Sequence, residues 1–437
     1  MFVSTRDGNN KVDFKDAVFQ GLCSDGGLFH FENMPNLTAL IHNFKETDSF
    51  IDIASNISLS LFPDLFSETE SRFVCEQAFR FGPKLVEIDE NIFCLELFHG
   101  PTCAFKDFGA AYLAACMEVF LKNDNKKAVI LTATSGDTGS AVANAFYLKN
   151  NIDVVILYPQ NRVSRLQEKQ LTTLGGNIHA LEVKGSFDDC QRIVKEAFTN
   201  IDLKRAYNLT SANSINLGRL IPQSFYYIWA YTQLKEKNEK ISFCVPSGNF
   251  GNLTAGLYAY FWGMPTEFFI AATNINDVVP EYLKTGSFFP RDSKKTLSNA
   301  MDVGNPSNFE RMLALYNNDS KKMSSEILYG VVTDDETLLT MKSYYKATKK
   351  FLDPHTAVGY KSAKEYFKAR RDYDGLIVLL STAHPGKFIE TVREATGITI
   401  PVPEAIKKYE NKEKISTIVN NSVDDLINYL DEKFRTK

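Results

Sequence analysis

The pattern of apolar and polar residues changes near residue 90. Up to that point it predicts a mostly helical segment, interrupted by a glycine-marked turn over 21–29. Beyond it, short β-branched apolar runs alternate with amphipathic stretches. Strands that are apolar on both faces and separated by helices are typical of a parallel sheet covered on both sides. The pattern therefore predicts an α/β protein with a mostly helical N-terminal extension.

Individual elements follow from the same pattern. A capping box at Ser67–Glu70 predicts a helix start in the extension, and 285–326, rich in Ser, Asn, Lys and Asp, predicts an irregular surface excursion or a mobile loop. After Ser422, apolar residues at helical spacing predict an amphipathic helix that docks on the body. The predicted strands are 128–132, 153–158, 178–183, 242–245, 268–272 and 376–380, and the predicted helices between them are 141–148, 163–174, 188–198 and 253–261.

The stretch from Cys94 to Phe120 breaks at a His-Gly-Pro turn and then places Lys106 at the start of a long helical pattern. Exposed amides at a helix start disfavour an ammonium group, and the apolar neighbours of Lys106 add a desolvation cost. Both effects lower the pKa of the amine, as a nucleophilic lysine requires. Taken alone, the stretch fits a surface lysine at a helix end better than a nucleophile.

Composition excludes several classes of function. The 437 residues are 44% hydrophobic and 23% charged with a formal net charge of -4, so neither nucleic acid nor an anionic membrane is an expected partner. Seven scattered cysteines form no C-x-x-C pair and no H-E-x-x-H occurs, so we expect neither a metal nor disulfides. No signal peptide or membrane-spanning run is evident, which favours the cytosol.

Three glycine-marked loops each follow a predicted strand and precede a helix, so they should meet at the carboxyl ends of the strands. The loop 247–252 places two glycines at a helix start, which suits a phosphate group, although it matches neither the P-loop nor the dinucleotide motif. The loop 134–139 suits a carboxylate, and 381–387 offers a hydroxyl and a histidine. Taken alone, the loop 247–252 could equally be an unliganded turn, the loop 134–139 fits a helix cap better, and His384 fits a structural histidine better.

Together, these features predict a pyridoxal 5'-phosphate site. Lys106 would form the imine, the loop 247–252 would hold the phosphate ester, and the hydroxyl of Thr382 would face the pyridine nitrogen. That combination of a desolvated lysine, a phosphate loop and a carboxylate loop is more specific than any of its parts.

The motifs LFHGPTCAFKDFG, LTATSGDTGSAVANAF, SANSINLGRL, VPSGNFGNLTAGL, TLSNAMDV and STAHPGKF resemble those of the threonine synthase family, in its branch with a long N-terminal extension. The resemblance runs from about residue 20 to past Lys387. It implies the type II pyridoxal phosphate fold and the conversion of O-phospho-L-homoserine and water into L-threonine and phosphate, by γ-elimination followed by β-addition of water.

The resemblance also implies site residues. Lys106 matches the lysine that carries the cofactor, Thr382 the residue at the pyridine nitrogen, and Asp137 a neighbour of the ring. Cys103 and Gly386 depart from the family pattern, and Cys103 is close enough to Lys106 to make the site sensitive to oxidants. The implied cofactor-phosphate residues are Gly248, Asn249, Phe250, Gly251 and Asn252, and the implied substrate residues are Thr134, Ser135, Gly136, Asp137, Thr138, Asn213 and Arg219.

Other points stay open at this level. Candidates for the substrate phosphate are Arg162, Arg165, Lys169, Ser211, Asn213 and Arg219, each of which could equally be a solvated surface residue. A dehydratase or β-replacement enzyme of the same fold, or a non-catalytic binding protein, are the alternative functions. We expect a monomer or homodimer with these parts: 1–90, the N-terminal extension; 91–127 with 241–402, the large cofactor-binding domain; 128–240, a smaller mobile domain; and 403–437, the docking tail.

Overall fold

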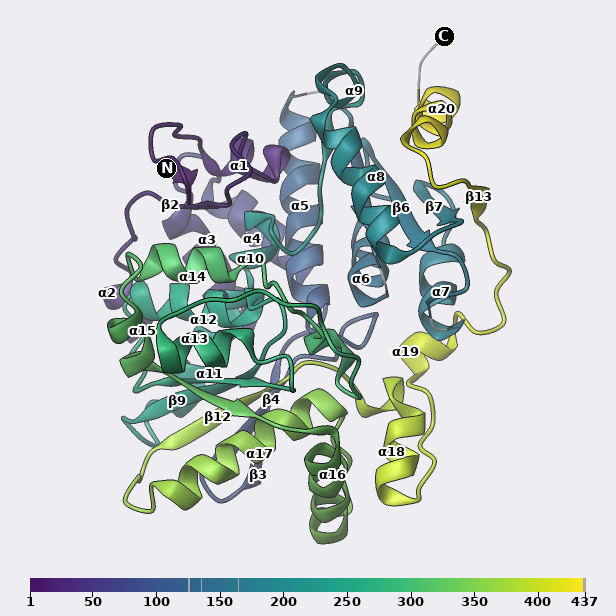
Figure 1. Cartoon of the computed structure of the whole chain (residues 1–437). Helices are drawn as coiled ribbons and strands as arrows, with labels where there is room; N and C mark the ends of the chain where they lie inside the picture. Colours follow the sequence, from purple (N-terminus) through teal and green to yellow (C-terminus); the bar gives the residue numbers. More distant parts are fainter. Residues whose placement is uncertain (125, 135, 164, 435–437) are drawn as a thin grey trace.

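Two sheets of mostly parallel strands form the body of the protein (Figure 1). The computed structural model describes residues 1–124, 126–134, 136–163 and 165–434. Within these ranges, none of the helices combines the length and the apolar character needed to span a bilayer. The fold is the predicted α/β class.

The N-terminal extension carries four helices, as its pattern predicts. Ser67 caps one of them through the predicted capping box with Glu70. A short antiparallel pair of strands, which the sequence did not predict, joins the chain start to the segment after the glycine turn. The elements are β1 (Phe2–Ser4), α1 (Phe14–Gln20), β2 (Phe29–Phe31), α2 (Thr38–Asn43), α3 (Phe50–Leu61) and α4 (Glu68–Ala78).

The larger sheet has six strands in the order β11-β10-β9-β12-β4-β3, all parallel except β3, which is antiparallel to β4. Its central strands are fully buried, which explains their continuous apolar runs. The strands are β3 (Lys84–Asp89), β4 (Ile92–Glu96), β9 (Ile241–Pro246), β10 (Phe269–Thr273), β11 (Ile327–Val331) and β12 (Leu376–Ser381).

Helices from the middle of the chain surround this sheet (Figure 1). The segment 285–326, predicted as irregular, contains two short helices and one 3-10 turn. The elements are α10 (Leu217–Leu220), α11 (Gln223–Leu234), α12 (Gly251–Phe261), α13 (Val278–Thr285), η1 (Asn299–Met301), α14 (Phe309–Leu315), α15 (Ser320–Glu326), α16 (Asp334–Thr348) and α17 (Pro354–Ala369).

The smaller sheet has five parallel strands in the order β13-β7-β6-β5-β8. Three of them match the predicted strands to within one residue at each end. The strands are β5 (Ala128–Ala133), β6 (Ile152–Pro159), β7 (Ile178–Val183), β8 (Leu209–Thr210) and β13 (Thr417–Val419), and the associated helices are α6 (Asp137–Phe146), α7 (Arg165–Thr172), α8 (Phe187–Thr199) and α9 (Ile201–Tyr207).

The long helix α5 (Lys106–Asp124) stands between the two sheets (Figure 1). Leu113, Met117 and Phe120 recur at helical spacing along one face, and they are at most 3% exposed. It packs against α4, α6 and α10, so its axis is fixed from three sides. The N-terminal residue of this helix is Lys106, the candidate catalytic lysine.

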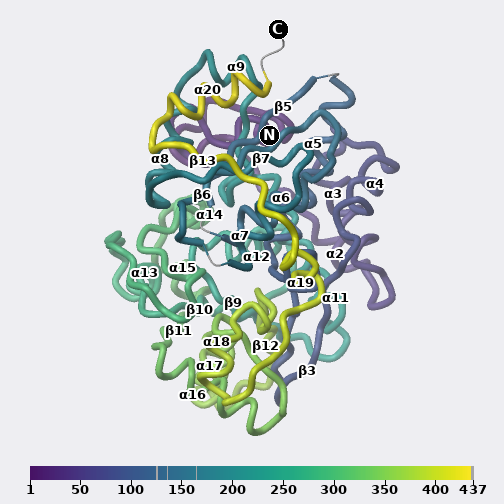
Figure 2. Tube along the Cα trace, turned by 90° about the vertical axis from the view of Figure 1, so that its right-hand side faces the viewer, coloured from purple at the N-terminus to yellow at the C-terminus, as the bar shows by residue number. Residues whose placement is uncertain are grey.

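The C-terminal part of the chain crosses from one sheet to the other. Figure 2 shows it passing over the side of the molecule, from the region of the larger sheet to that of the smaller one. Val419 lies in β13, which pairs with β7, and Leu426 of the last helix is buried against the same sheet. The elements are η2 (Pro385–Lys387), α18 (Ile389–Thr396), α19 (Glu404–Lys407), β13 and α20 (Val423–Phe434).

The predicted domain limits remain a prediction, but two strands cross them. β3 lies before residue 90 and yet pairs in the larger sheet, and β13 belongs to the tail and yet completes the smaller one. The tail is therefore part of a sheet and more than a docking helix.

Candidate functional site

Backbone hydrogen bonds hold the loop before Lys106 against the end of β12. Leu97 N donates to Ser381 O at 3.0 Å, Phe105 N donates to Thr382 O at 2.9 Å, and His384 N donates to Cys103 O at 3.1 Å. The loop thus extends the sheet beyond the strands proper. As a consequence, Lys106 and Thr382, which lie far apart in sequence, are held close together.

The Lys106 amine lies in the environment that its neighbours predict. Its side chain is 21% exposed, and Nζ lies 3.9 Å from Asp137 Oδ2. Burial lowers the pKa of the amine below its ordinary value against the attraction of Asp137, and the cations of Lys387 and Arg219 lower it further. A lysine with a lowered pKa is suited to nucleophilic attack and to proton transfer.

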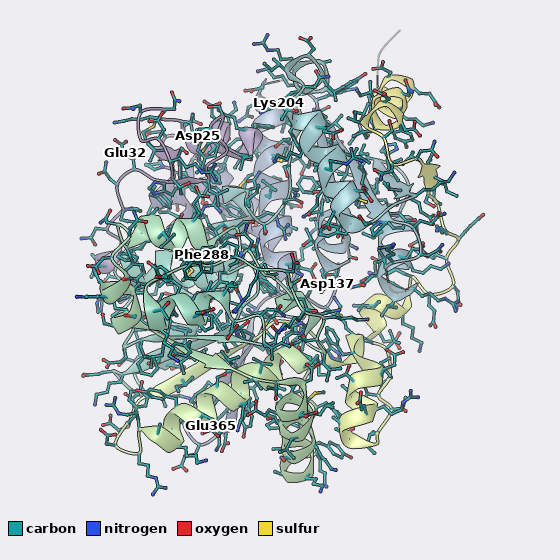
Figure 3. All side chains as sticks on the ribbon, viewed as in Figure 1. Asp25, Glu32, Asp137, Lys204, Phe288 and Glu365 are labelled. Atoms are coloured by element: carbon teal, nitrogen blue, oxygen red, sulfur yellow. The ribbon has the colours of Figure 1, made fainter. Side chains whose placement is uncertain are left out.

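Asp137, which follows a strand of the smaller sheet, is bound by a side chain that follows a strand of the larger sheet. It starts α6 beside the smaller sheet, and it lies between the two halves of the molecule (Figure 3). Lys387 Nζ, from the loop after β12, donates to Asp137 Oδ1 at 2.8 Å and to Thr102 O at 3.0 Å, and Gln167 Nε2 donates to Asp137 at 3.0 Å. Burial alone would raise the pKa of Asp137, but Lys387 and Lys106 hold it well below its usual range.

The glycine loop after β9 has the form of an anion site. Phe250, at the N-cap of α12, has φ +57° and provides no side-chain cap. Within the described residues, the backbone N–H groups from Gly248 to Asn252 have no hydrogen-bond acceptor. Gly248 is required, because a Cβ there would lie 2.3 Å from Ala300 O. Unpaired amides at a helix start are suited to a phosphate group.

The side chains of two asparagines make this loop rigid. Asn252 bridges its base, accepting from Ser247 Oγ at 2.8 Å and donating to Pro246 O at 2.8 Å. Asn249 Nδ2 donates to Ser214 Oγ at 2.9 Å, so its side chain fixes the loop and is not free to bind a ligand. The amides of the loop are therefore held in place before any ligand arrives.

Thr382 lies next to this loop because of the strand register. Leu379 of β12 pairs with Cys244 of β9, which places the two strand ends side by side. Thr382 is 6% exposed, and its hydroxyl has no hydrogen-bond partner among the residues that the structure describes. It is available to a ligand heteroatom.

The loop after β5 is only partly available to a substrate. The hydroxyl of Thr134 accepts from Gly136 N at 3.0 Å and from Gly139 N at 2.9 Å, so it shapes the loop. Gly136 has φ +154°, and a Cβ there would collide with Gln167. Thr138 is half-buried beside Asp137. Ser135, the remaining residue of this predicted set, lies outside the described residues.

Arg219 is the one candidate for the substrate phosphate that is buried beside Lys106. It is 3% exposed, Nη1 donates to Ala212 O at 2.7 Å, and Nε has no partner among the described residues. Burial lowers the pKa of its guanidinium to about 10, against the attraction of Asp107. An unpaired N–H on a buried cation is a strong candidate for binding an anion.

The other candidates are placed less favourably. Asn213 is half-buried and accepts from Thr132 Oγ1 at 3.2 Å, and Ser211 is buried. Arg162 and Arg165 are exposed near the start of α7. The amine of Lys169 is engaged elsewhere, because its Nζ donates to the backbone carbonyl of Lys412 in the tail.

Asp107 follows Lys106 and has a structural role. Both of its oxygens accept from Thr102, the backbone N at 2.9 Å and Oγ1 at 2.6 Å. Burial raises the pKa of Asp107 to about 6 against these bonds. A Cβ at Gly100 would lie 2.4 Å from this carboxylate, which explains the glycine in the turn.

The two departures from the family pattern lie in tightly packed places. Cys103 is 3% exposed with φ +55°, and burial raises the pKa of its thiol to about 11, which argues against the predicted oxidant sensitivity. At Gly386 a Cβ would lie 2.7 Å from Pro403, so only glycine lets this part of the tail pack so closely against the loop.

Sequence reasoning missed Lys387 and the segment from η1 to α14. Lys387 was quoted only as part of a motif, although a lysine at a strand end with 4% side-chain exposure is a functional candidate. His355 explains part of the missed segment: its Nε2 accepts from Ala300 N at 3.1 Å, and this holds η1 over Gly248. The polar composition of 285–326 concealed these contacts.

The residues present fit pyridoxal phosphate. The phosphate requires amide donors, which the loop 248–252 provides, and the aldehyde requires an amine of lowered pKa, which Lys106 provides. Thr382 offers an unpaired hydroxyl at the adjacent strand end. Among the described residues, no group of three or more His, Cys, Asp or Glu side chains forms a metal site.

Comparisons with known proteins agree with this geometry. Residues 1–79 match the family model "Threonine synthase N terminus", 77–382 match "Pyridoxal-phosphate dependent enzyme", and 356–429 match "Threonine synthase, C-terminal". The threonine synthase of Haemophilus influenzae is 43% identical over 96% of this chain and 97% of its own length.

Solved structures show the same likeness over the full length. The pyridoxal-phosphate-bound threonine synthase of Brucella melitensis superposes with a TM-score of 0.92 at 34% identity, covering 100% of this chain and 99% of the other. That of Escherichia coli gives 0.88 at 39% identity, covering 99% of each chain. The chain belongs to the threonine synthase family of pyridoxal-phosphate-dependent enzymes.

Proposed function

We propose that this chain converts O-phospho-L-homoserine and water into L-threonine and inorganic phosphate, with Lys106 as its catalytic residue. The observation that carries the proposal is the position of the Lys106 amine, which lies 3.9 Å from Asp137 and beside Lys387 at the end of β12. Full-length similarity to threonine synthases supports the same reaction.

The residues that would hold the cofactor divide between two strand ends. The backbone amides of 248–252 would bind the phosphate, Lys106 would carry the aldehyde carbon, and Thr382 and Asp137 would be available to the ring. When bound, pyridoxal phosphate supplies an electron sink for negative charge at the substrate's α-carbon.

The side chains of this chain then move protons and hold the substrate. Once the substrate's amino group has replaced Lys106 on the aldehyde carbon, the released Lys106 amine would take the proton from Cα. Burial, together with repulsion by Lys387, would keep that amine neutral. The loop 136–138 binds the α-carboxylate at the start of α6, and Arg219 with Asn213 binds the phosphate that leaves Cγ. Closure of the part that carries the smaller sheet would exclude water before phosphate leaves.

Borohydride trapping combined with a product assay tests the proposal. Purified protein should be yellow, and borohydride should fix the cofactor on the peptide that contains Lys106. Lys106→Ala should lower the rate of phosphate and threonine formation by about 10²–10⁴-fold, the usual contribution of a positioned acid–base group. Covalent cofactor on another lysine of the Lys106→Ala protein would defeat the assignment.

The runner-up function is addressed by the same assay. A protein that leaves O-phosphohomoserine intact but deaminates serine or threonine would be a dehydratase of this fold.

The cysteines favour a cytosolic location. All seven are free thiols, which fits a reducing compartment, and we further propose that the enzyme works in the cytosol. Light scattering decides between the predicted monomer and homodimer.

A further inference from the structure

Asn308 carries an unsatisfied hydrogen-bond donor beside the glycine loop. Its side chain is 0% exposed, and its Nδ2 has no partner among the residues that the structure describes. A buried amide without a partner costs roughly 1–3 kcal/mol, so the position calls for an acceptor. Nδ2 lies 3.2 Å from where a Cβ on Gly251 would be, at the first turn of α12.

Arg311 fixes which way the Asn308 amide points. Arg311 Nη1 donates to Asn308 Oδ1 at 2.7 Å, and a guanidinium has no acceptor, so the oxygen of the amide must face Arg311. The NH2 group therefore faces the other way, toward Gly251. The backbone agrees, because Ser307 N donates to Asn249 Oδ1 at 2.6 Å and Asn308 N donates to Asn249 O at 3.3 Å.

Arg311 is also a buried cation without a counter-ion. It is 0% exposed, and no carboxylate of the described residues lies within ion-pair distance of it. Its other donors bind the carbonyls of Phe29, at 2.8 Å, and Ile215. Glu310, the acidic neighbour, is paired with Arg6 and Thr5. Burial of an unpaired charge is costly, and a nearby anion would offset that cost.

We propose that Asn308 Nδ2 donates a hydrogen bond to the phosphate group of the cofactor, and that Arg311 orients this donor and supplies the positive charge that balances the phosphate. Asn308 is then a binding residue, and Arg311 is a positioning residue that acts through it. The inference rests on the proposed placement of the cofactor phosphate in the loop 248–252. It links that phosphate to the N-terminal extension through Phe29 and to the 211–220 segment through Ile215.

Cofactor affinity measured with and without the phosphate group tests the proposal. In cofactor-free protein, Asn308→Asp keeps the shape of the side chain but replaces the donor with a carboxylate oxygen facing the phosphate. We expect its affinity for pyridoxal 5'-phosphate to fall about 10- to 100-fold, the value of a charge-assisted hydrogen bond, while its affinity for pyridoxal stays unchanged. The 31P resonance of the bound cofactor should shift as well.

Two further variants keep the test decisive. Asn305→Asp makes the same chemical change at an exposed position three residues earlier and should leave both affinities at the wild-type value. Arg311→Lys keeps the charge but loses the forked donor, so it should weaken binding of the phosphorylated cofactor alone, and less than Asn308→Asp does. This variant supplies the answer if Asn308→Asp fails to fold.

The results separate this inference from the proposed function. Equal losses for pyridoxal and pyridoxal phosphate, or no loss in either substituted protein, would overturn the role of Asn308 and Arg311. Absence of threonine formation by the unsubstituted chain would instead count against the proposed function, whatever Asn308 does.

Discussion

Asp137 is shared by two lysines, and the sharing is unequal. Lys387 Nζ lies 2.8 Å from one carboxylate oxygen and Lys106 Nζ lies 3.9 Å from the other. Because one carboxylate can neutralise only one ammonium, the amine that lies farther away loses its proton more easily. Burial is the main cause of the lowered pKa of Lys106, and Lys387 adds to it in a way that the local sequence does not reveal.

Replacing Lys387 tests this arrangement. Lys387→Gln removes a cation and leaves Asp137 to Lys106, so the pKa of the Lys106 amine should rise. The rate at which pyridoxal phosphate attaches covalently to the cofactor-free protein should then reach its half-maximum at a correspondingly higher pH. Lys407→Gln, at an exposed lysine of α19, is the control and should leave the profile unchanged. An unshifted profile in Lys387→Gln would contradict the argument.

At this scale the sequence predicts a residue well when its local neighbours determine its chemistry. Lys106 lies at a helix start among apolar residues, and both facts can be read from the sequence. Lys387 and Arg311 are buried by segments far away in the chain, the first beside Asp137 and the second beside Phe29. Local pattern assigns both to solvent.

The turn from β9 into α12 is packed against η1, so the two segments support each other. Gly248 touches the backbone of Ala300, which His355 holds in place through a hydrogen bond of 3.1 Å. The turn can bind an anion only if its amides stay aligned, and η1 prevents it from opening outward.

A methyl group at Gly248 should disturb this unit specifically. In Gly248→Ala the Cβ would lie 2.3 Å from Ala300 O, so η1 or the turn must move, at a cost of about 1–3 kcal/mol. We expect a lower free energy of unfolding in urea and a weaker affinity for pyridoxal phosphate. Gly82→Ala has open space around its Cβ and should show neither effect. Unchanged cofactor affinity in Gly248→Ala would mean that the turn is more adaptable than its contacts indicate.

Burial made most strands of the two sheets predictable, although β4, buried at four of its five positions, was not predicted. β5, β6, β7, β9, β10 and β12 are buried throughout, or nearly so, and their β-branched apolar runs predict them to within about two residues. β11 is an edge strand with alternating exposure that follows a helix without a turn signal, and β13 has only three residues. Gly330 interrupts the apolar run of β11, and β13 is too short to give a pattern.

At the scale of the whole molecule, the tail connects the larger sheet to the smaller one through ion pairs and hydrogen bonds. Lys414 Nζ lies 2.6 Å from Glu168 Oε1 and 2.6 Å from Glu182 Oε2, and Ile415 N donates to Thr172 O at 2.6 Å. Tyr409, earlier in the tail, donates to Asn144 Oδ1 at 2.6 Å. These contacts fasten the end of the chain to the smaller sheet and its helices.

Loss of the Lys414 ammonium should destabilise the protein in a pH-dependent way. Burial alone would raise the pKa of Glu182, but Lys414 holds it below its ordinary value of 4.5, so this stabilisation is present above pH 4.5 and is lost as the pH falls. Lys414→Met should therefore lower the free energy of unfolding by about 1–2 kcal/mol at pH 7, a value limited by the partial exposure of Lys414, and by less at pH 3. Lys407→Met is the control. An equal loss at both pH values would show that packing, and not charge, accounts for the effect.

At this largest scale the sequence predicts the class of fold but not the pairing of remote segments. Alternating strands and helices indicate parallel sheets, yet nothing local to 417–419 points to 181–183 as its partner. The same holds for Arg311 and Phe29, which are 282 residues apart. Such contacts depend on the arrangement of all the elements between them.

The position of β13 also affects how the protein is made. This strand follows the other four strands of the smaller sheet in the sequence, so it leaves the ribosome after all of them. Until it arrives, β7 borders the smaller sheet with unpaired N–H and C=O groups, the kind of edge on which nascent chains stick to one another. A polypeptide cut off before Thr417 would thus contain all the proposed site residues and yet keep this unpaired sheet edge.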